Sequence, residues 1–552
     1  MMKIKIHLLA AALLGALSIP TLAAEAPRPN VLFVCVDDLK PILGCYGAPI
    51  IQSPNIDRLA ARGVRFANAY TNQAVCAPSR NSLLTGKRST TIGIYDLGTN
   101  FRLSVPDAVT IPQLFKGQGW RSEAMGKIFH VGHGNHEDPA SWSVPHWAAK
   151  GVMYSVESNR GADGHGAPVE CADVPDSTYN DGRIADEAIL RLRAAKDRPD
   201  QPFFVAVGFL KPHLPFVAPK KYWDLYQREQ FKLPERTTPP EGAPEFAPTA
   251  WGELRQYSDI PATGQLSAEK ARELIHGYHA AVSYMDAQFG RVLDELDKLD
   301  LARNTIIVLW GDHGWHLGDH GMWCKHTNYE QAAHIPLLVV APGVTKPGTT
   351  IKALAESVDL YPTLCELAGL KAPSGLDGMS LVPALRDPEG GRTKEAVFHA
   401  YPRSPKGMGE IIGRAVRTNR YRLVEWKKPG ATPETAILEL YDYENDPGET
   451  KNLAAGQPEV VANLRAMLAT QPEAKAQIKT NQPAAEAKPK PAATDRNQLF
   501  EQKDADHDGK LTREEFLAKQ PDPDKAPARF TRFDSDGDGV LTRDEFVGMG
   551  KK

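Results

Sequence analysis

Long apolar runs are absent from most of this 552-residue sequence. After residue 24, no stretch reaches the roughly 18 uninterrupted apolar residues that a membrane-spanning helix requires. A strong net charge is absent as well, because 65 basic residues stand against 68 acidic ones, for a net charge of -3. The sequence therefore predicts a mature protein without a membrane span and without the positive field that nucleic-acid binding needs.

Cysteine is scarce, with six residues, and no two of them form a C-x-x-C pair. This spacing argues against a zinc knuckle and a thioredoxin-type redox site. Six cysteines are also too few to support a chain of this length as a disulfide scaffold. The six are Cys35, Cys45, Cys76, Cys171, Cys324 and Cys365.

The N-terminal segment has the layout of a secretory signal peptide. A basic start at Lys3 and Lys5 precedes a largely apolar run over residues 6–19, and small side chains suited to cleavage follow it. We expect a signal peptide over residues 1–23 and a secreted or periplasmic protein. The alternative, an uncleaved membrane anchor, is disfavoured because the apolar run is short.

Residues 28–394 alternate apolar runs with amphipathic helical patterns. Apolar runs without a polar alternation predict strands buried on both faces, and helices between such strands are typical of an α/β domain around a mostly parallel sheet. The expected strands cover residues 31–36, 203–207, 305–310 and 337–340, and two of the expected helices cover residues 53–63 and 268–299.

Three further parts follow this domain. Strand and helix patterns over residues 395–470 predict a smaller α+β subdomain packed on the large one. Residues 471–494 are rich in Ala, Pro, Lys, Glu and Gln, which is the composition of a linker. A separate module, residues 495–550, closes the chain and is expected to be all-α.

Polar side chains follow two expected strands at their carboxyl ends, where ligands bind in open parallel sheets. Asp37 and Asp38 follow the first strand, and Asp312 and His313 follow the strand over residues 305–310. Three carboxylates and an imidazole suit a hard divalent cation such as calcium or magnesium. The alternative for any one of these acids is an ordinary cap of the following helix.

Basic side chains follow two other expected strands. Lys127 and His130 follow one of them, and Lys211 and His213 follow the other. Four expected strands that are each followed by polar or charged side chains favour one shared crevice. For Lys211 alone, an ordinary solvated lysine is an equal alternative. The cations expected to face an anionic substrate across the metal are Lys127, Lys211, Lys325 and Arg80.

The segment Cys76-Ala77-Pro78-Ser79-Arg80 places a thiol at the start of an expected helix, because proline is favoured in a helix's first turn. At a helix N-terminus, backbone N–H groups and the helix dipole favour an anion. The residues alone predict either a thiol near an anion site or a buried cysteine before an ordinary helix.

Residues 76–80 match the C-x-P-S-R signature of type I sulfatases, in which the cysteine is oxidised to formylglycine. Residues 29–38 look like that family's opening strand and metal pair, and residues 53–60 look like its first helix. Residues 440–453 are similar to its usual C-terminal segment, so the resemblance covers residues 29 to about 470. It implies the alkaline-phosphatase-like sulfatase fold and the hydrolysis of sulfate esters.

Within the family, the sequence looks most like the iduronate-2-sulfatase branch. Lys127 and His130 have that branch's longer spacing, and residues 206–216 and 311–325 are similar to its loop patterns. His313 stands where many other sulfatases carry Asn as the fourth metal ligand. The cysteines do not match the disulfide pairs of the branch, and the pairing therefore stays open.

The resemblance implies that a maturation enzyme converts the cysteine of the signature to formylglycine. One hydroxyl of the hydrated aldehyde would attack the sulfur of the ester, and deprotonation of the other would expel sulfate from the resulting sulfo-enzyme. The implied substrate is a sulfated carbohydrate, with a 2-O-sulfated uronic acid suggested by the branch. The implied ligands of one catalytic calcium ion are Asp37, Asp38, Asp312, His313 and the modified Cys76.

The implied catalytic residues are Cys76, Arg80, Lys127, His130, His213 and Lys325. Arg80 and Lys127 are expected to stabilise charge on the hydrate and the sulfate. His213 and Lys325 are placed by resemblance to protonate the leaving oxygen, and His130 is the candidate base, although the assignment of acid and base stays open. The alternatives are a phosphodiesterase or phosphonate hydrolase on the same scaffold, and a non-catalytic binding protein.

Two segments of the last module, residues 504–515 and 534–545, fit the 12-residue loop of an EF-hand. Calcium requires the oxygen ligands, turn glycine and final bidentate glutamate that both segments supply, so we expect up to two further calcium ions. A solvated acidic tail would not repeat this pattern, and we favour a tethering or docking role. The expected ligands are Asp504, Asp506, Asp508, Lys510 and Glu515 in the first loop and Asp534, Asp536, Asp538, Val540 and Glu545 in the second.

Overall fold

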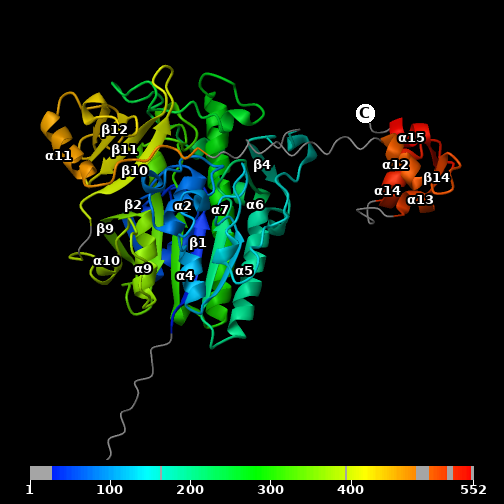
Figure 1. The fold of residues 1–552 in the computed structure, drawn as a ribbon, viewed down its shortest axis with the longest axis horizontal. Helices are drawn as coiled ribbons and strands as arrows, with labels where there is room; N and C mark the ends of the chain where they lie inside the picture. Colours follow the sequence, from blue (N-terminus) through cyan, green and yellow to red (C-terminus); the bar gives the residue numbers. More distant parts are fainter. Residues whose placement is uncertain (1–27, 162–164, 392–393, 480–495, 519–525, 549–552) are drawn as a thin grey trace, which may run out of the picture. The chain divides into compact units, whose positions relative to one another are not determined.

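The computed structural model describes residues 28–161, 165–391, 394–479, 496–518 and 526–548. The predicted signal peptide lies outside the described residues. The chain divides into two compact units, Met1–Ile478 and Lys479–Lys552 (Figure 1). Among the described residues, no helix is long and apolar enough to cross a membrane.

A seven-stranded sheet in the order β3-β5-β1-β7-β8-β2-β9 forms the centre of the first unit (Figure 1). Only β8 runs against its neighbours, so the expected mostly parallel sheet is confirmed. The strands are β1 (Asn30–Val36), β2 (Val64–Tyr70), β3 (Arg121–Gly126), β5 (Phe203–Phe209), β7 (Thr305–Gly311), β8 (His334–Val340) and β9 (Thr349–Glu356).

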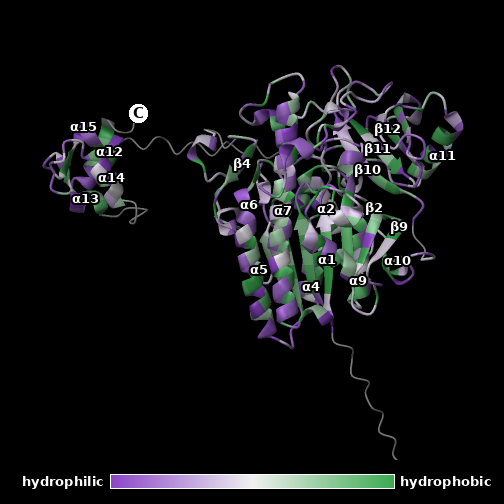
Figure 2. Cartoon of the chain, turned by 180° about the vertical axis from the view of Figure 1, so that it is seen from behind, coloured by the Kyte–Doolittle hydropathy of each residue, from purple (hydrophilic) through white to green (hydrophobic). Residues whose placement is uncertain are grey.

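Helices cover both faces of this sheet because its strands are apolar on both sides. Along β1, Leu32 and Val34 join one hydrophobic core, whereas Val31 and Phe33 join the other, as the alternation of strand side chains requires. Figure 2 shows mostly hydrophobic strands behind helices that mix hydrophobic and hydrophilic residues. One layer contains α1 (Pro54–Arg62), α5 (Asn180–Lys196) and α7 (Ala268–Lys298), and the other contains α2 (Cys76–Thr85), α4 (Ile111–Gly117), α9 (Leu360–Leu367) and α10 (Val382–Arg386).

Shorter elements connect these layers. Two strands, β4 (Val169–Ala172) and β6 (Phe216–Pro219), pair in parallel as a small separate sheet. The short helices are α3 (Ser89–Ile92), α6 (Lys220–Trp223) and α8 (Glu330–Ala333). All six cysteines lie among the described residues and all are free.

A four-stranded antiparallel sheet follows, as expected for the α+β subdomain. Ala415 and Trp426 join the core of the first unit, whereas Val416 and Leu423 pack with α11 on the opposite face. Within the first unit, the second sheet therefore packs on the large α/β domain through one of its faces. Its elements are β10 (Val397–Arg403), β11 (Ile411–Arg417), β12 (Tyr421–Lys427), β13 (Ile437–Asp442) and α11 (Pro458–Ala469).

The described residues immediately after α11 differ from the expected linker. The amide of Lys475 donates to the Thr90 carbonyl at 3.0 Å, and the amide of Ile478 donates to the Gly93 carbonyl at 2.9 Å. The Tyr95 hydroxyl also donates to the Lys475 carbonyl at 2.8 Å. The chain thus stays packed on the first unit up to Ile478, and residues 480–494 of the predicted linker lie outside the described residues.

The second unit contains two helix–loop–helix segments whose loops pair through short antiparallel strands. Its core is formed by phenylalanines, among them Phe500, Phe516 and Phe546. The strands are an addition to the all-α module that the sequence predicts. The elements are α12 (Arg496–Lys503), β14 (Lys510–Thr512), α13 (Arg513–Leu517), α14 (Ala526–Phe533), β15 (Val540–Thr542) and α15 (Arg543–Gly548).

Both loops of this unit gather carboxylates. Ligand atoms of Asp504, Asp506 and Glu515 lie within 4.8 Å of one another, and so do those of the corresponding set, Asp534, Asp536 and Glu545. Asp508 and Asp538 accept hydrogen bonds from the amides two residues further on, at 2.8 and 3.0 Å. Lys510 and Val540 begin the two strands, so each would contribute a backbone carbonyl rather than a side chain.

Candidate active site

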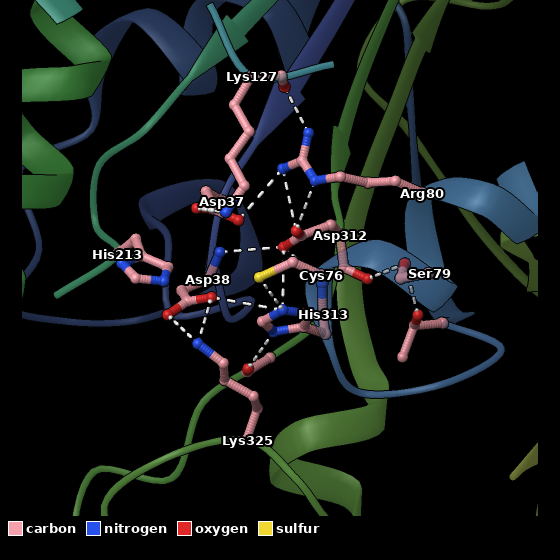
Figure 3. A network of polar contacts seen from close by, with 12 residues as sticks. Asp37, Asp38, Cys76, Ser79, Arg80, Lys127, His213, Asp312, His313 and Lys325 are labelled. Carbon is pink, nitrogen blue, oxygen red and sulfur yellow. Dashed lines mark hydrogen bonds and ion pairs between the residues drawn. The ribbon is translucent and has the colours of Figure 1, made fainter. Parts of the chain in front are cut away.

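The pairing of β1 with β7 brings the two predicted metal pairs together. Val36 lies opposite Gly311 in the parallel register, so the residues that follow both strands emerge at the same edge. Ligand atoms of Asp37, Asp38, Cys76 and His313 all lie within 4.8 Å of one another, and all four residues are buried (Figure 3). The structure thus unites the predicted ligands from three separate parts of the chain.

Asp312, the remaining predicted ligand, organises this cluster. One of its carboxylate oxygens accepts the backbone N–H of Asp38 at 3.0 Å and that of His313 at 2.9 Å. The His313 Nε2 atom lies 3.4 Å from a carboxylate oxygen of Asp38. Buried carboxylates with one imidazole are the donor set of a hard divalent cation, so these residues fit the expected calcium ion.

Cys76 is the first residue of α2 and is only 3% exposed. Its Sγ atom lies 3.4 Å from His313 Nε2. Ser79 fixes this end of the helix by donating its hydroxyl to the Asp312 carbonyl at 2.6 Å. Burial and Asp37 act to raise the pKa of the thiol, but the positive charges of Lys127, Lys325 and His313 outweigh them and lower that pKa well below its ordinary value.

Arg80 lies one helical turn further along α2, fully buried. Its guanidinium contacts Asp312 at 2.9 Å and Asp37 at 3.2 Å, and it also donates to the carbonyls of Lys127 and Ile128. Protein acceptors thus surround all three nitrogens. Arg80 was expected to face the substrate, but in this structure it holds the two carboxylates in place.

Two lysines border the cluster on different sides (Figure 3). The Lys127 ammonium lies 2.5 Å from Asp37, and the Lys325 ammonium lies 3.0 Å from Asp38. Lys325 also lies over the Trp315 ring, 4.8 Å from its centroid. Both predicted lysines therefore belong to the same buried site as Cys76.

His213 lies next to Lys325 on this side of the site. Glu253, a residue that the sequence does not predict to be functional, contacts both of them. His213 Nε2 lies 3.1 Å from the Glu253 carboxylate, which also lies 2.7 Å from the Lys325 ammonium. Against the effect of burial, Asp38 and Asp37 raise the pKa of His213 to about 10. No motif or strand end marks Glu253 in the sequence.

A cavity of about 510 Å³ opens beside the cluster and is lined by Asp37, Lys127 and His213 among others. His130 also lines it, with Nε2 3.2 Å from Nδ1 of His133, and burial lowers the pKa of His130. Lys211 is not a solvated lysine, because its ammonium is buried and donates to the carbonyls of His213 and Pro215 at 2.7 Å each. Burial lowers the pKa of Lys211 to about 8.

Comparisons with protein families agree with this site. Residues 29–370 match the family described as Sulfatase, and residues 318–475 match the C-terminal region of N-sulphoglucosamine sulphohydrolase. Residues 497–518 and 528–549 match the EF hand. The family matches therefore cover both compact units.

Curated proteins that are similar to this chain in sequence are also sulfatases. The chain is 36% identical to the iduronate 2-sulfatase of Homo sapiens, over 77% of this chain and 90% of the relative. It is 32% identical to a sulfatase of Formosa agariphila, over 78% of this chain and 84% of that protein.

Solved structures share the expected alkaline-phosphatase-like sulfatase fold. A protein in complex with its substrate D-glucosamine-2-N,6-O-disulfate is 25% identical, with a TM-score of 0.66, over 80% of this chain and 97% of the other. The phosphonate monoester hydrolase of Silicibacter pomeroyi shares the fold at 23% identity and a TM-score of 0.64, over 80% and 94%. Together with the site's geometry, the family match and the identity to iduronate 2-sulfatases show that the chain is a sulfuric ester hydrolase and belongs to the sulfatase family, in its iduronate-2-sulfatase-like branch.

Proposed function

We propose that the protein is an exported sulfatase that removes sulfate from a sulfated carbohydrate, with a 2-O-sulfated uronic acid as the candidate substrate. We propose further that a maturation enzyme converts Cys76 to formylglycine. The observation that carries this proposal is the position of Cys76, whose side chain lies among buried metal ligands and cations at a helix N-terminus. The identity to iduronate 2-sulfatases supports the choice of sugar.

The oxidised residue would supply an aldehyde whose hydrate provides the attacking hydroxyl. The position of residue 76 favours negative charge, because it is the first residue of α2 and a helix N-terminus favours an anion. Lys127 contacts Asp37 and lines the cavity beside the cluster, where its ammonium would bind a sulfate oxygen. The chain thus surrounds the reacting group with positive charge.

A calcium ion would be held by Asp37, Asp38, Asp312 and His313, where it would polarise the sulfate oxygens. Arg80 supports this site by fixing Asp37 and Asp312, and it compensates part of their charge. The three carboxylates and one imidazole are a donor set that suits this ion.

Protons must move at two places during hydrolysis. His213 and Lys325 border the site together, and either would donate a proton to the leaving sugar oxygen. His130 lines the cavity, and its lowered pKa keeps its imidazole neutral, which is the form that accepts a proton. His130 is accordingly our candidate base for the release of sulfate.

A panel of sulfated disaccharides tests this function directly. We expect sulfate monoesters to be hydrolysed with a kcat/KM at least about 100-fold above that for a phosphate diester, because the site offers its cations to one terminal anionic group. Bis(4-nitrophenyl) phosphate serves as the diester. A preference for the diester in side-by-side measurements would instead favour the phosphodiesterase alternative.

The second compact unit should be dispensable for the reaction itself. We expect the double variant Glu515→Gln/Glu545→Gln to lose calcium from the C-terminal loops. Its kcat/KM on a small soluble substrate should stay within about twofold of the parent value, because both loops lie entirely within the second unit. Calcium per chain and initial rates provide the two readouts, and truncation after residue 485 should give the same rates. A large loss of rate in either protein would make this unit part of the catalytic machinery.

A further inference from the structure

Glu253 lies in a long connection, residues 231–267, that contains little regular structure but is anchored close to this residue. Trp251, Leu254 and Tyr257 of this loop are all buried in the main hydrophobic core. The Arg255 guanidinium stacks 3.4 Å from the centre of the Trp251 ring and donates to the carbonyls of Ala250 and Gly264 at 3.0 and 2.9 Å. The segment that carries Glu253 is therefore held from several sides.

The backbone next to Glu253 is strained. Trp251 has φ +48°, in the left-handed region that bulky residues rarely adopt. Such a conformation persists only where the surrounding structure imposes it. Trp251 meets this condition because it is buried in the main hydrophobic core, and the carboxylate of nearby Glu253 faces the active site.

This carboxylate contacts two cationic side chains that come from different loops. Its oxygens lie 2.7 Å from the Lys325 ammonium and 3.1 Å from His213 Nε2. Each cation is held on its other side, Lys325 by Asp38 at 3.0 Å and His213 by the Leu214 carbonyl, 2.7 Å from Nδ1. Glu253 is thus the shared contact that fixes the two groups side by side.

A carboxylate at this place works against the binding of an anion. Sulfate would be attracted by Lys325 and His213 and repelled by Glu253. Glu253 therefore contributes something other than affinity for sulfate. We propose that Glu253 is a positioning residue, which holds Lys325 and His213 in the geometry needed to protonate the leaving oxygen.

This inference rests on the proposed function and is tested with Glu253→Gln, which keeps the size of the side chain and removes its charge. On the sulfated disaccharide that the panel identifies, we expect kcat to fall by about 10- to 100-fold, the scale of a misplaced catalytic group. The inhibition constant of inorganic sulfate should stay the same or fall, because a repelling charge has been removed. Glu253→Asp keeps the charge and should recover part of kcat.

Glu241→Gln is the matched control, since Glu241 lies in the same loop and pairs with Lys451 at the surface, 3.2 Å away. It should leave both constants unchanged. An unchanged kcat in Glu253→Gln would overturn the inference. A fall in kcat together with roughly tenfold weaker sulfate inhibition in both Glu253 variants would also overturn it, because that combination indicates a collapsed site. A parent enzyme that hydrolyses no sulfate ester would instead overturn the proposed function.

Discussion

Replacement of Cys76 by alanine is expected to lower kcat/KM for sulfate esters by roughly 10⁴-fold or more, the scale of the loss of a covalent nucleophile. The physical reason is that an alanine side chain cannot be converted to an aldehyde hydrate, so the metal ligands and cations would surround an inert methyl group. The fold should persist, because alanine favours a helix and the α2 contact between Ser79 and Asp312 stays in place. Initial rates and thermal unfolding provide the two measurements.

Cys365→Ala is the matched control, because Cys365 is a buried free cysteine in α9, outside the cluster. Both variants remove one buried thiol, and both should unfold at similar temperatures. Only Cys76→Ala should lose activity. Rates within about tenfold of the parent in Cys76→Ala would contradict the assignment of residue 76 as the nucleophile.

Asp312→Asn is expected to remove most of the catalytic calcium and to lower kcat/KM by at least about 100-fold. The amide keeps the shape of the side chain but withdraws one of the three negative charges that would hold the ion. Arg80 keeps its contact with Asp37 at 3.2 Å, so the buried guanidinium retains an ionic partner and the protein should still fold. Metal content by mass spectrometry and steady-state rates test this expectation, and His313→Ala should behave alike.

Asp442→Asn provides the matched control for Asp312→Asn. Asp442 is likewise a buried aspartate paired with an arginine, Arg420, at 2.8 Å, but it lies in β13 of the second sheet. It should lose stability without losing catalytic calcium. Equal calcium contents in Asp312→Asn and the parent would show that Asp312 is not needed to hold the ion.

Much of the fold could be predicted because it depends on apolar patterning. The run over residues 31–36 predicts a strand, and β1 spans Asn30–Val36; the amphipathic pattern over residues 268–299 predicts a helix, and α7 spans Ala268–Lys298. By contrast, composition predicts that the packed segment after α11 belongs to the linker. Its attachment uses backbone hydrogen bonds, such as those of Lys475 and Ile478, which composition does not reveal.

In the active site, too, some residues could be predicted from the sequence and others could not. Asp37 and Asp312 could be found because they follow strands, and parallel strands bring their ends to one edge. Glu253 could not be found, because its contact with Lys325 depends on how an irregular loop packs. The orientation of Arg80 was also beyond the sequence, since its motif gives its position in α2 but not the carboxylates and carbonyls that surround its guanidinium.

Mass spectrometry of the peptide that contains residue 76, taken from an active preparation, shows directly whether the cysteine has been converted. We expect that the residue has lost its sulfur and gained an aldehyde, and that the aldehyde content rises in proportion to specific activity across preparations. An unmodified Cys76 in a fully active enzyme would contradict the proposed mechanism.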